Sequence, residues 1–166
     1  MTRVACIVNP NARDGKLGRT FYKVEESLNS SGIDFDVFMT AGKGHAIEIS
    51  SDLRGSDYDL VVAVGGDGTV HEVANGIRGS DMRLGVIPMG NGDDFARSIG
   101  IPLNDIDGAV SILKEGIDYN VGGIRVEGLK PRNILEYLHQ STIQLQGSHP
   151  ERRIWFAGAF LSVMEE

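Results

Sequence analysis

The segment from Leu60 to Ile77 constrains the fold of this chain more than any other. It begins with a continuous apolar run, Leu60–Val64, which is typical of a strand covered on both faces. A glycine-rich turn, Gly65-Gly66-Asp67-Gly68, follows at once. Beyond the turn, apolar residues repeat at the spacing of an amphipathic helix, at Val70, Val73, Ala74 and Ile77. A buried strand that enters a helix through such a turn indicates an α/β architecture.

Strands and helices alternate in the same way along most of the chain. Further apolar runs that predict strands lie at residues 4–8, 35–39, 84–87 and 117–121. Apolar residues at helical spacing predict helices at residues 21–28, 46–53 and 106–113, with a short helix around Phe95. We therefore expect residues 1–121 to form an α/β domain, with a parallel sheet covered by helices on both faces. Loops that follow parallel strands meet at one edge of the sheet, so we expect one cluster of the loops that begin at Asn9, Thr40, Gly65 and Pro88.

The composition argues against several classes of partner. The formal net charge of -7 disfavours a nucleic-acid partner and strong adhesion to an anionic membrane. Cys6 is the only cysteine, so no intrachain disulfide can form. The sequence shows neither a signal-peptide pattern nor an apolar run of the roughly 20 residues that a transmembrane helix needs. These features predict a cytoplasmic protein without a transmembrane segment.

The glycine-rich turn suits a phosphorylated ligand. Gly65 and Gly66 allow a ligand to approach the backbone closely, and free N–H groups at the start of the helix can hold anionic oxygens. Asp67 would repel phosphate, so it needs a Mg²⁺ bridge, a ribose hydroxyl or an acceptor hydroxyl as its partner. The alternative is a structural turn, since Thr69 and Glu72 match the capping-box pattern. We expect ligand binding at the turn, a functional role for Asp67 and a capping role for Glu72.

The same turn resembles a known family. Residues 65–69, with Glu72, Asn75 and Gly76, are similar to the nucleotide-binding signature of the diacylglycerol kinase catalytic domain, which sphingosine kinases and bacterial lipid kinases share. NAD kinases and phosphofructokinases carry related glycine-aspartate turns. Three other segments resemble the family in the same order along the chain: Asn9-Pro10 with Gly15 and Gly18, Thr40 with His45-Ala46, and residues 84–97. Four matches in order make the resemblance specific.

The resemblance implies the N-terminal domain of the NAD kinase and diacylglycerol kinase-like fold. It also implies a lipid kinase that uses ATP and Mg²⁺ and transfers the γ-phosphoryl group to a hydroxyl of a diacylglycerol-like lipid. Asp67 would be the catalytic residue and would orient the Mg²⁺-nucleotide or the acceptor hydroxyl. No residue is assigned as a metal ligand, because the four histidines show no metal-ligand spacing with Cys6. The nucleotide would contact Asn9, Pro10, Asn11, Ala12, Arg13, Thr40, Gly66, Asp67, Gly68, Thr69, Val70, His71, Glu72 and Asn91.

Two residues depart from the family pattern. Asn91 stands where the family has a threonine, and Asp93 stands where it has an asparagine. Asn91 can still donate and accept hydrogen bonds. Asp93 adds a negative charge close to the expected phosphates, which would weaken nucleotide binding unless a metal intervenes. It is equally explained as a first-turn carboxylate favoured by the helix dipole.

Members of the family place a second, mostly β domain after this one. The resemblance implies that the second domain carries the lipid pocket, further metal ligands and the general base. Residues 154–160 faintly resemble its first strand, and we expect residues 122–166 to be an incomplete or divergent remnant of it. Apolar side chains left exposed there would favour association, so we expect a homo-oligomer that buries Trp155, Phe156, Phe160 and Leu161.

Two other functions remain open. The first is a non-catalytic nucleotide-binding or interaction domain, which the short second part, Asn91 and Asp93 all favour. The second is an NAD kinase-like activity. The similarity of residues 93–97 to the lipid-kinase segment argues against this second alternative.

Overall fold

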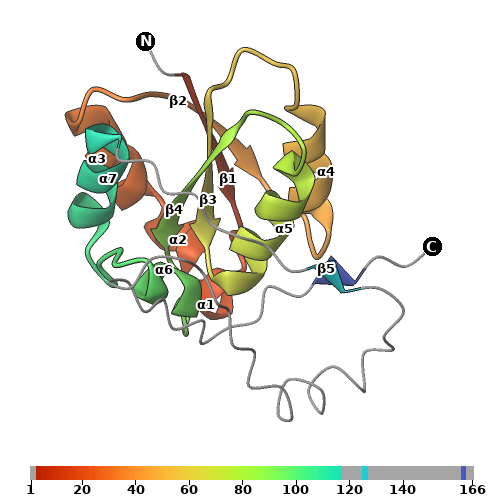
Figure 1. The fold of residues 1–166 in the computed structure, drawn as a ribbon. Helices are drawn as coiled ribbons and strands as arrows, with labels where there is room; N and C mark the ends of the chain where they lie inside the picture. The colour runs from red at the N-terminus through yellow and green to blue at the C-terminus, as the bar shows by residue number, and fades with distance from the viewer. Residues whose placement is uncertain (1–2, 117–124, 127–161, 164–166) are drawn as a thin grey trace, which may run out of the picture.

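The computed structural model describes residues 3–116, 125–126 and 162–163, and its elements are labelled in Figure 1. The strands are β1 (Arg3–Val8), β2 (Asp34–Met39), β3 (Leu60–Gly65), β4 (Arg83–Pro88), β5 (Arg125–Val126) and β6 (Ser162–Val163). The helices are α1 (Ala12–Gly15), α2 (Leu17–Thr20), α3 (Tyr22–Ser30), α4 (His45–Asp52), α5 (Asp67–Ile77), α6 (Asp94–Ser98) and α7 (Ile106–Glu115).

Strands β1 to β4 form one parallel sheet in the order β2-β1-β3-β4. Val4 of β1 pairs with Phe35 on one side and with Leu60 on the other. At the carboxyl edge of the sheet, Gly65 of β3 pairs with Pro88 of β4. The expectation of an α/β fold with a parallel sheet is therefore confirmed. Strands β5 and β6 pair with each other in parallel, as a separate two-stranded sheet.

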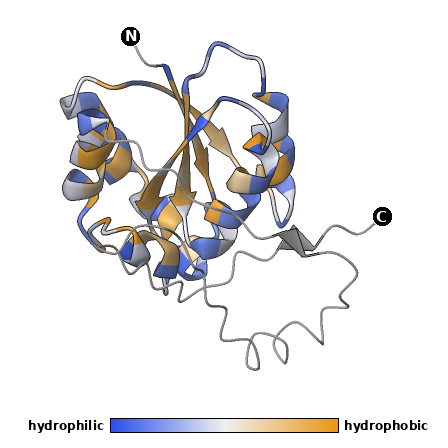
Figure 2. Cartoon of the chain, in the orientation of Figure 1, coloured by the Kyte–Doolittle hydropathy of each residue, from blue (hydrophilic) through white to orange (hydrophobic). Residues whose placement is uncertain are grey.

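Helices cover both faces of the four-stranded sheet, with α3 and α7 on one side and α4 and α5 on the other (Figure 1). Alternate side chains of β1 point to opposite faces of the sheet. Cys6 belongs to the core under α3 and α7, and Ile7 belongs to the core under α4 and α5. Both side chains are fully buried. Figure 2 shows the resulting pattern, in which hydrophobic strands lie between helices with hydrophilic outer surfaces. This double burial is why the strands read as continuous apolar runs.

The loop after β1 differs from the sequence-based expectation. The loop expected to begin at Asn9 contains the single helical turn α1. Within that turn Arg13 and Asp14 have φ values of 53° and 57°, in the left-handed region. Such φ values are uncommon for residues other than glycine. The Arg13 side chain anchors the turn, because its Nε donates a hydrogen bond to the Gly90 carbonyl at 3.0 Å.

Several expectations fall outside the described residues. They are the strand at 117–121, the boundary near residue 121, the remnant domain at 122–166 and the apolar cluster around Trp155 that predicts a homo-oligomer. The short strands β5 and β6 are the described parts of that region. These expectations remain predictions.

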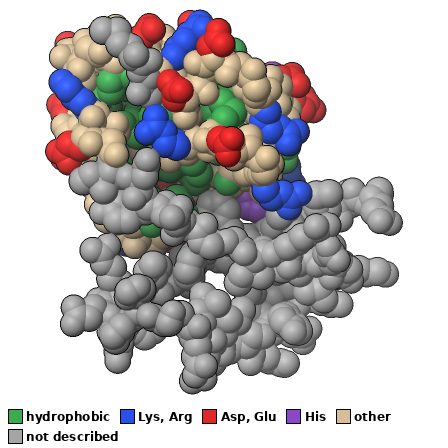
Figure 3. Space-filling view, turned by 45° about the horizontal axis from the view of Figure 1, so that its top comes forward, with side chains coloured by type: hydrophobic (Ala, Val, Ile, Leu, Met, Phe, Trp, Pro, Cys, Tyr) green, Lys and Arg blue, Asp and Glu red, His purple; other side chains and the backbone are tan. Residues whose placement is uncertain are grey.

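Charged side chains of both signs are interspersed on the face shown in Figure 3. Within the part of the chain that the structure describes, no helix is both long enough and apolar enough to cross a bilayer. Cys6 is buried in the sheet, and burial raises the pKa of its thiol to about 12. The thiol is therefore protonated at neutral pH and unreactive.

Candidate functional site

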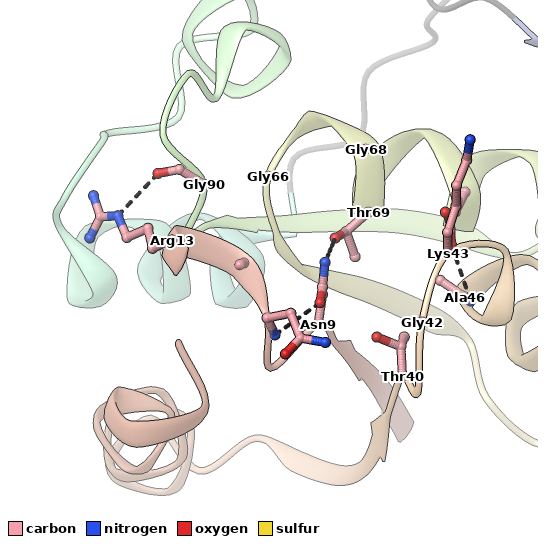
Figure 4. A pocket seen from close by; sticks show the side chains of 13 residues that line it. Asn9, Arg13, Thr40, Gly42, Lys43, Ala46, Gly66, Gly68, Thr69 and Gly90 are labelled. Atoms are coloured by element: carbon pink, nitrogen blue, oxygen red, sulfur yellow. Dashed lines mark hydrogen bonds between the residues drawn. The ribbon is translucent and has the colours of Figure 1, made fainter. Parts of the chain in front are cut away.

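A cavity of about 330 Å³ opens at the carboxyl edge of the parallel sheet (Figure 4). It is lined by residues from the loops that follow β1, β2, β3 and β4 and from the first turns of α4 and α5. The convergence of these loops, expected because each follows a strand of a parallel sheet, is thus present in the structure. The lining consists of Asn9, Asn11, Ala12, Arg13, Thr40, Gly42, Lys43, Ala46, Gly66, Gly68, Thr69, Glu72 and Gly90.

The glycines of the β3 and β4 loops allow these loops to touch. A Cβ atom added to Gly90 would lie 2.5 Å from the Cα of Gly66, a separation that no real side chain tolerates. A Cβ added to Gly65 would lie 2.5 Å from Oγ1 of Thr69, inside the same turn. Thr69 also accepts a long hydrogen bond from Nδ2 of Asn9, at 3.4 Å. Glycine at these positions therefore brings the loops after β1, β3 and β4 against one another.

Helix α5 begins without a side-chain cap. Its N-cap is Gly66, whose carbonyl accepts hydrogen bonds from the N–H groups of Thr69 and Val70. The N–H groups of Asp67 and Gly68 lie before the first of these bonds, and the first amides of a helix have no acceptor within the helix. The positive end of the helix dipole lies at the same place. This end of α5 borders the cavity through Gly66 and Gly68 and is chemically suited to anionic oxygens.

The capping box predicted at Thr69 and Glu72 is wrong. Helix α5 starts at Asp67, so Thr69 lies inside the first turn and cannot be the N-cap. Glu72 instead reaches α4, where its carboxylate accepts hydrogen bonds from the N–H of Gly44 at 2.9 Å and of Ala46 at 3.3 Å. Glu72 is a cap, but the helix that it caps is α4.

Asp67 joins the β3 turn to α6. Its two carboxylate oxygens accept hydrogen bonds from the N–H of Phe95 at 2.9 Å and of Asp94 at 3.1 Å. Asp67 is half-buried and does not line the cavity. In this structure it positions the loop after β4.

Asp93 is 6% exposed and has a φ of 53°. It occupies the N-cap position of α6, but its carboxylate turns back and accepts the N–H of Gly90 at 2.9 and 3.1 Å. Burial raises the pKa of Asp93, and the nearby charge of Asp67 raises it further. The Gly90 N–H and the guanidinium groups of Arg13 and Arg97 act in the opposite direction on this pKa. The carboxylate therefore fixes the β4 loop without capping α6 through its side chain.

Most of the residues predicted to contact the nucleotide lie on the cavity wall: Asn9, Asn11, Ala12, Arg13, Thr40, Gly66, Gly68, Thr69 and Glu72. Five do not. Val70 is buried in the core, Asp67 contacts α6, and Asn91 is exposed. Pro10 lies against Gly18. His71 is half-buried, and burial lowers the pKa of its imidazole, although the charge of Glu72 opposes the shift.

The cavity also contains residues that sequence reasoning did not assign to the site, namely Gly42, Lys43, Ala46 and Gly90. A signal was present, because the run Gly42-Lys43-Gly44 lies in the loop after β2 and indicates a glycine-rich loop there. Within the described residues, no group of three or more histidine, cysteine or acidic side chains is arranged to hold a metal ion.

Comparisons with known proteins agree with this architecture. The family model described as the diacylglycerol kinase catalytic domain matches residues 3–125. Two solved structures of a provisionally assigned diacylglycerol kinase from Bacillus anthracis str. Sterne are 32% identical to this chain, with a TM-score of 0.61. A third structure, described as a diacylglycerol kinase from the same organism, is 32% identical, with a TM-score of 0.60. No curated protein matches the chain.

The aligned part covers 69% of this chain but 42% of each of the first two structures and 39% of the third. The chain therefore spans about two fifths of the length of these similar proteins. The family model and the structural similarity identify the same domain. This chain belongs to the diacylglycerol kinase catalytic domain family.

Proposed function

We propose that this chain binds ATP with Mg²⁺ in the cavity at the carboxyl edge of the sheet, as the donor site of a lipid kinase. One observation carries the proposal: the uncapped start of α5 and the close-packed glycine loops border a cavity of about 330 Å³. Backbone amides at a helix start, with little side-chain bulk around them, suit phosphate oxygens. The γ-phosphoryl group would pass to the hydroxyl of a diacylglycerol-like lipid.

The residues present fit a nucleotide. Gly68 lines the cavity, and a Cβ added there would meet no atom of a neighbouring segment within 4 Å, so this glycine faces open space. The amides of Asp67 and Gly68 would hold phosphate oxygens, while Asn9 and Thr40 offer polar side chains to the rest of the ligand. Bound Mg·ATP supplies the phosphoryl group and neutralises its charge. Asp67 is the proposed catalytic residue. Its carboxylate also accepts hydrogen bonds from the first amides of α6, which hold the loops after β3 and β4 together.

Isothermal titration with Mg·ATP and Mg·ADP tests the binding step. We expect saturable binding to the wild-type chain and a loss of affinity of about tenfold or more in Gly68→Ala, the scale of one added methyl group in a tight site. The Gly68→Ala variant should stay folded, because the added Cβ meets no protein atom. No heat change at millimolar nucleotide with folded wild-type protein would refute the proposed function.

The transfer step needs a separate measurement. We expect radiolabel from γ-labelled ATP to appear in diacylglycerol presented in mixed micelles, and Asp67→Ala to lower that rate by orders of magnitude. Label found in NAD instead would favour the NAD kinase alternative. Tight nucleotide binding without any labelled product would favour a non-catalytic nucleotide-binding domain.

A further inference from the structure

Among the described residues, the cavity wall carries two cationic side chains, Arg13 and Lys43, which lie on opposite sides (Figure 4). A phosphate chain bound between the loops would need positive charge as well as backbone amides. The two cations differ in how much of their hydrogen-bonding capacity the protein already uses. This difference indicates which of them is available to a ligand.

Arg13 is largely engaged with the protein. Its Nε donates to the carbonyl of Gly90 at 3.0 Å, and its Nη2 donates to Oδ1 of Asn104. These bonds tie the α1 turn to the loop after β4 and to the segment before α7. Movement of the guanidinium toward a ligand would break them. Arg13 is therefore mainly an anchor of the cavity wall.

Lys43 is in the opposite situation. No hydrogen bond or ion pair joins its ammonium group to another described residue. Its side chain is exposed, lines the cavity and lies on the same side of it as Ala46 (Figure 4). Lys43 thus places at the cavity a positive charge that no described residue pairs with.

The backbone beneath Lys43 is held firmly. Glu72 accepts the N–H groups of Gly44 and Ala46, on the two sides of His45. Nδ1 of His45 in turn accepts the N–H of Ala41 at 2.8 Å. The carboxylate of Glu72 accepts hydrogen bonds from these amides. The positive charge of Lys43 offsets the repulsion between this carboxylate and an anionic ligand. The stem of Lys43 is therefore anchored while its ammonium group remains available.

We propose that the Lys43 ammonium group binds the phosphate chain of the nucleotide and is a specificity-determining residue for phosphorylated ligands at this site. The inference rests on the proposed nucleotide-binding function and deepens it. An ammonium group donates up to three hydrogen bonds and accepts none, so it discriminates phosphate oxygens from uncharged parts of the ligand. Adenosine, which lacks phosphate, should not depend on Lys43.

Titration calorimetry with ATP, ADP and adenosine tests the inference on the 166-residue chain and on Lys43→Gln, Lys43→Arg and Lys23→Gln. Lys23 is an exposed lysine of α3 outside the cavity wall, so its variant makes the same change of charge at a remote place. We expect Lys43→Gln to bind ATP and ADP about tenfold more weakly than wild type, which is the scale of one charge-assisted hydrogen bond. Its affinity for adenosine should equal that of wild type. Lys43→Arg should retain most of the affinity, and Lys23→Gln all of it. Added salt should weaken ADP binding by wild type more than by Lys43→Gln.

The outcomes separate the inference from the function on which it rests. Unchanged ADP affinity in Lys43→Gln, with binding by wild type intact, overturns the inference alone. An equal loss for ADP and adenosine also overturns it, because it indicates contact with the base or a shifted loop. Absence of nucleotide binding by folded wild-type protein overturns both the inference and the proposed function.

Discussion

Asp67, Glu72 and Asp93 each use carboxylate oxygens to bind backbone amides of a neighbouring loop. Asp67 holds the start of α6, Glu72 holds the start of α4, and Asp93 holds the amide of Gly90. Hydrogen bonds to a charged acceptor are stronger than those between neutral groups. These residues stabilise the loops around the cavity, and the amides at the start of α5 remain available for a ligand.

The buried carboxylate of Asp93 should make stability depend on pH. Because burial raises its pKa, the folded protein binds this proton more tightly than the unfolded chain does. Its contribution to stability is complete below the ordinary pKa of 3.8 and is lost as the pH rises through the raised value. In Asp93→Asn this loss is absent. We therefore expect the free energy of unfolding of Asp93→Asn, relative to wild type, to increase from pH 4 to pH 7 in urea denaturation.

Asp94→Asn is the matched control for Asp93→Asn. Asp94 is the next residue, but it is exposed and pairs with Arg97 at the surface. Exposed pairs contribute little to stability. The relative stability of Asp94→Asn should not increase with pH. A relative stability of Asp93→Asn that stays flat or falls from pH 4 to pH 7 would contradict the account of the Asp93 carboxylate.

The residue types of the site could be predicted from the sequence, but not all of their hydrogen-bond partners could. Gly66, Gly68 and Thr40 could be predicted as site residues because each lies in the turn just after the end of a strand. The partner of Glu72 could not, since it lies 28 residues away in another loop. A capping box is a local pattern, and the start of α5 at Asp67 overrode it. Lys43 was missed because the flanking glycines, Gly42 and Gly44, indicate a loop after β2 but not that its lysine lines a cavity.

At the scale of elements, the contact between α4 and α5 depends on one glycine. A Cβ added to Gly76 would lie 1.8 Å from Oγ of Ser50 and 2.7 Å from the carbonyl oxygen of Ile47. Ser50 is fully buried, and its hydroxyl donates to the Ala46 carbonyl at 2.5 Å, so it has little room to move. The close packing of α5 on α4 therefore requires glycine at position 76. Helix α5 also carries part of the cavity wall, so this packing helps to place the wall.

Substitution of Gly76 should reverse the usual effect of a glycine-to-alanine change in a helix. Alanine normally stabilises a helix interior by about 1 kcal/mol relative to glycine. Here the clash of the added Cβ with α4 should outweigh that gain. We expect Gly76→Ala to lower the free energy of unfolding by about 1–3 kcal/mol. Gly68→Ala, in the first turn of the same helix, is the control, because its Cβ would meet nothing within 4 Å. Equal stability of the two variants in urea denaturation would contradict the close packing of α4 on α5.

The elements themselves were largely predictable, for a physical reason. Strands buried on both faces leave continuous apolar runs, and helices packed on a sheet leave a repeat such as Val70, Val73 and Ile77. The turn α1 was not predictable. Its left-handed residues Arg13 and Asp14 need support from tertiary contacts such as the Arg13 bond to Gly90, which no local pattern encodes.

At the scale of the whole molecule, the cavity joins parts that are distant in the sequence. Its wall takes residues from the loops after all four strands of the sheet, from Asn9 to Gly90. The two helical layers meet the sheet on opposite faces, and the loops link both layers at its carboxyl edge. A ligand in this cavity would therefore contact segments on which both cores depend. Its binding should stabilise the domain as one unit and not merely order a single loop.

Nucleotide binding should raise the free energy of unfolding by an amount fixed by mass action. At a free Mg·ADP concentration ten times the dissociation constant, the expected gain is about 1.4 kcal/mol, and at a hundred times it is about 2.7 kcal/mol. Thermal unfolding followed by circular dichroism would show this gain as a midpoint that rises with the logarithm of nucleotide concentration. Gly68→Ala, which adds a methyl group at a residue that lines the cavity, should show a smaller rise at each concentration. An equal rise in both proteins would place the nucleotide away from the start of α5, because binding there cannot ignore a methyl group at Gly68.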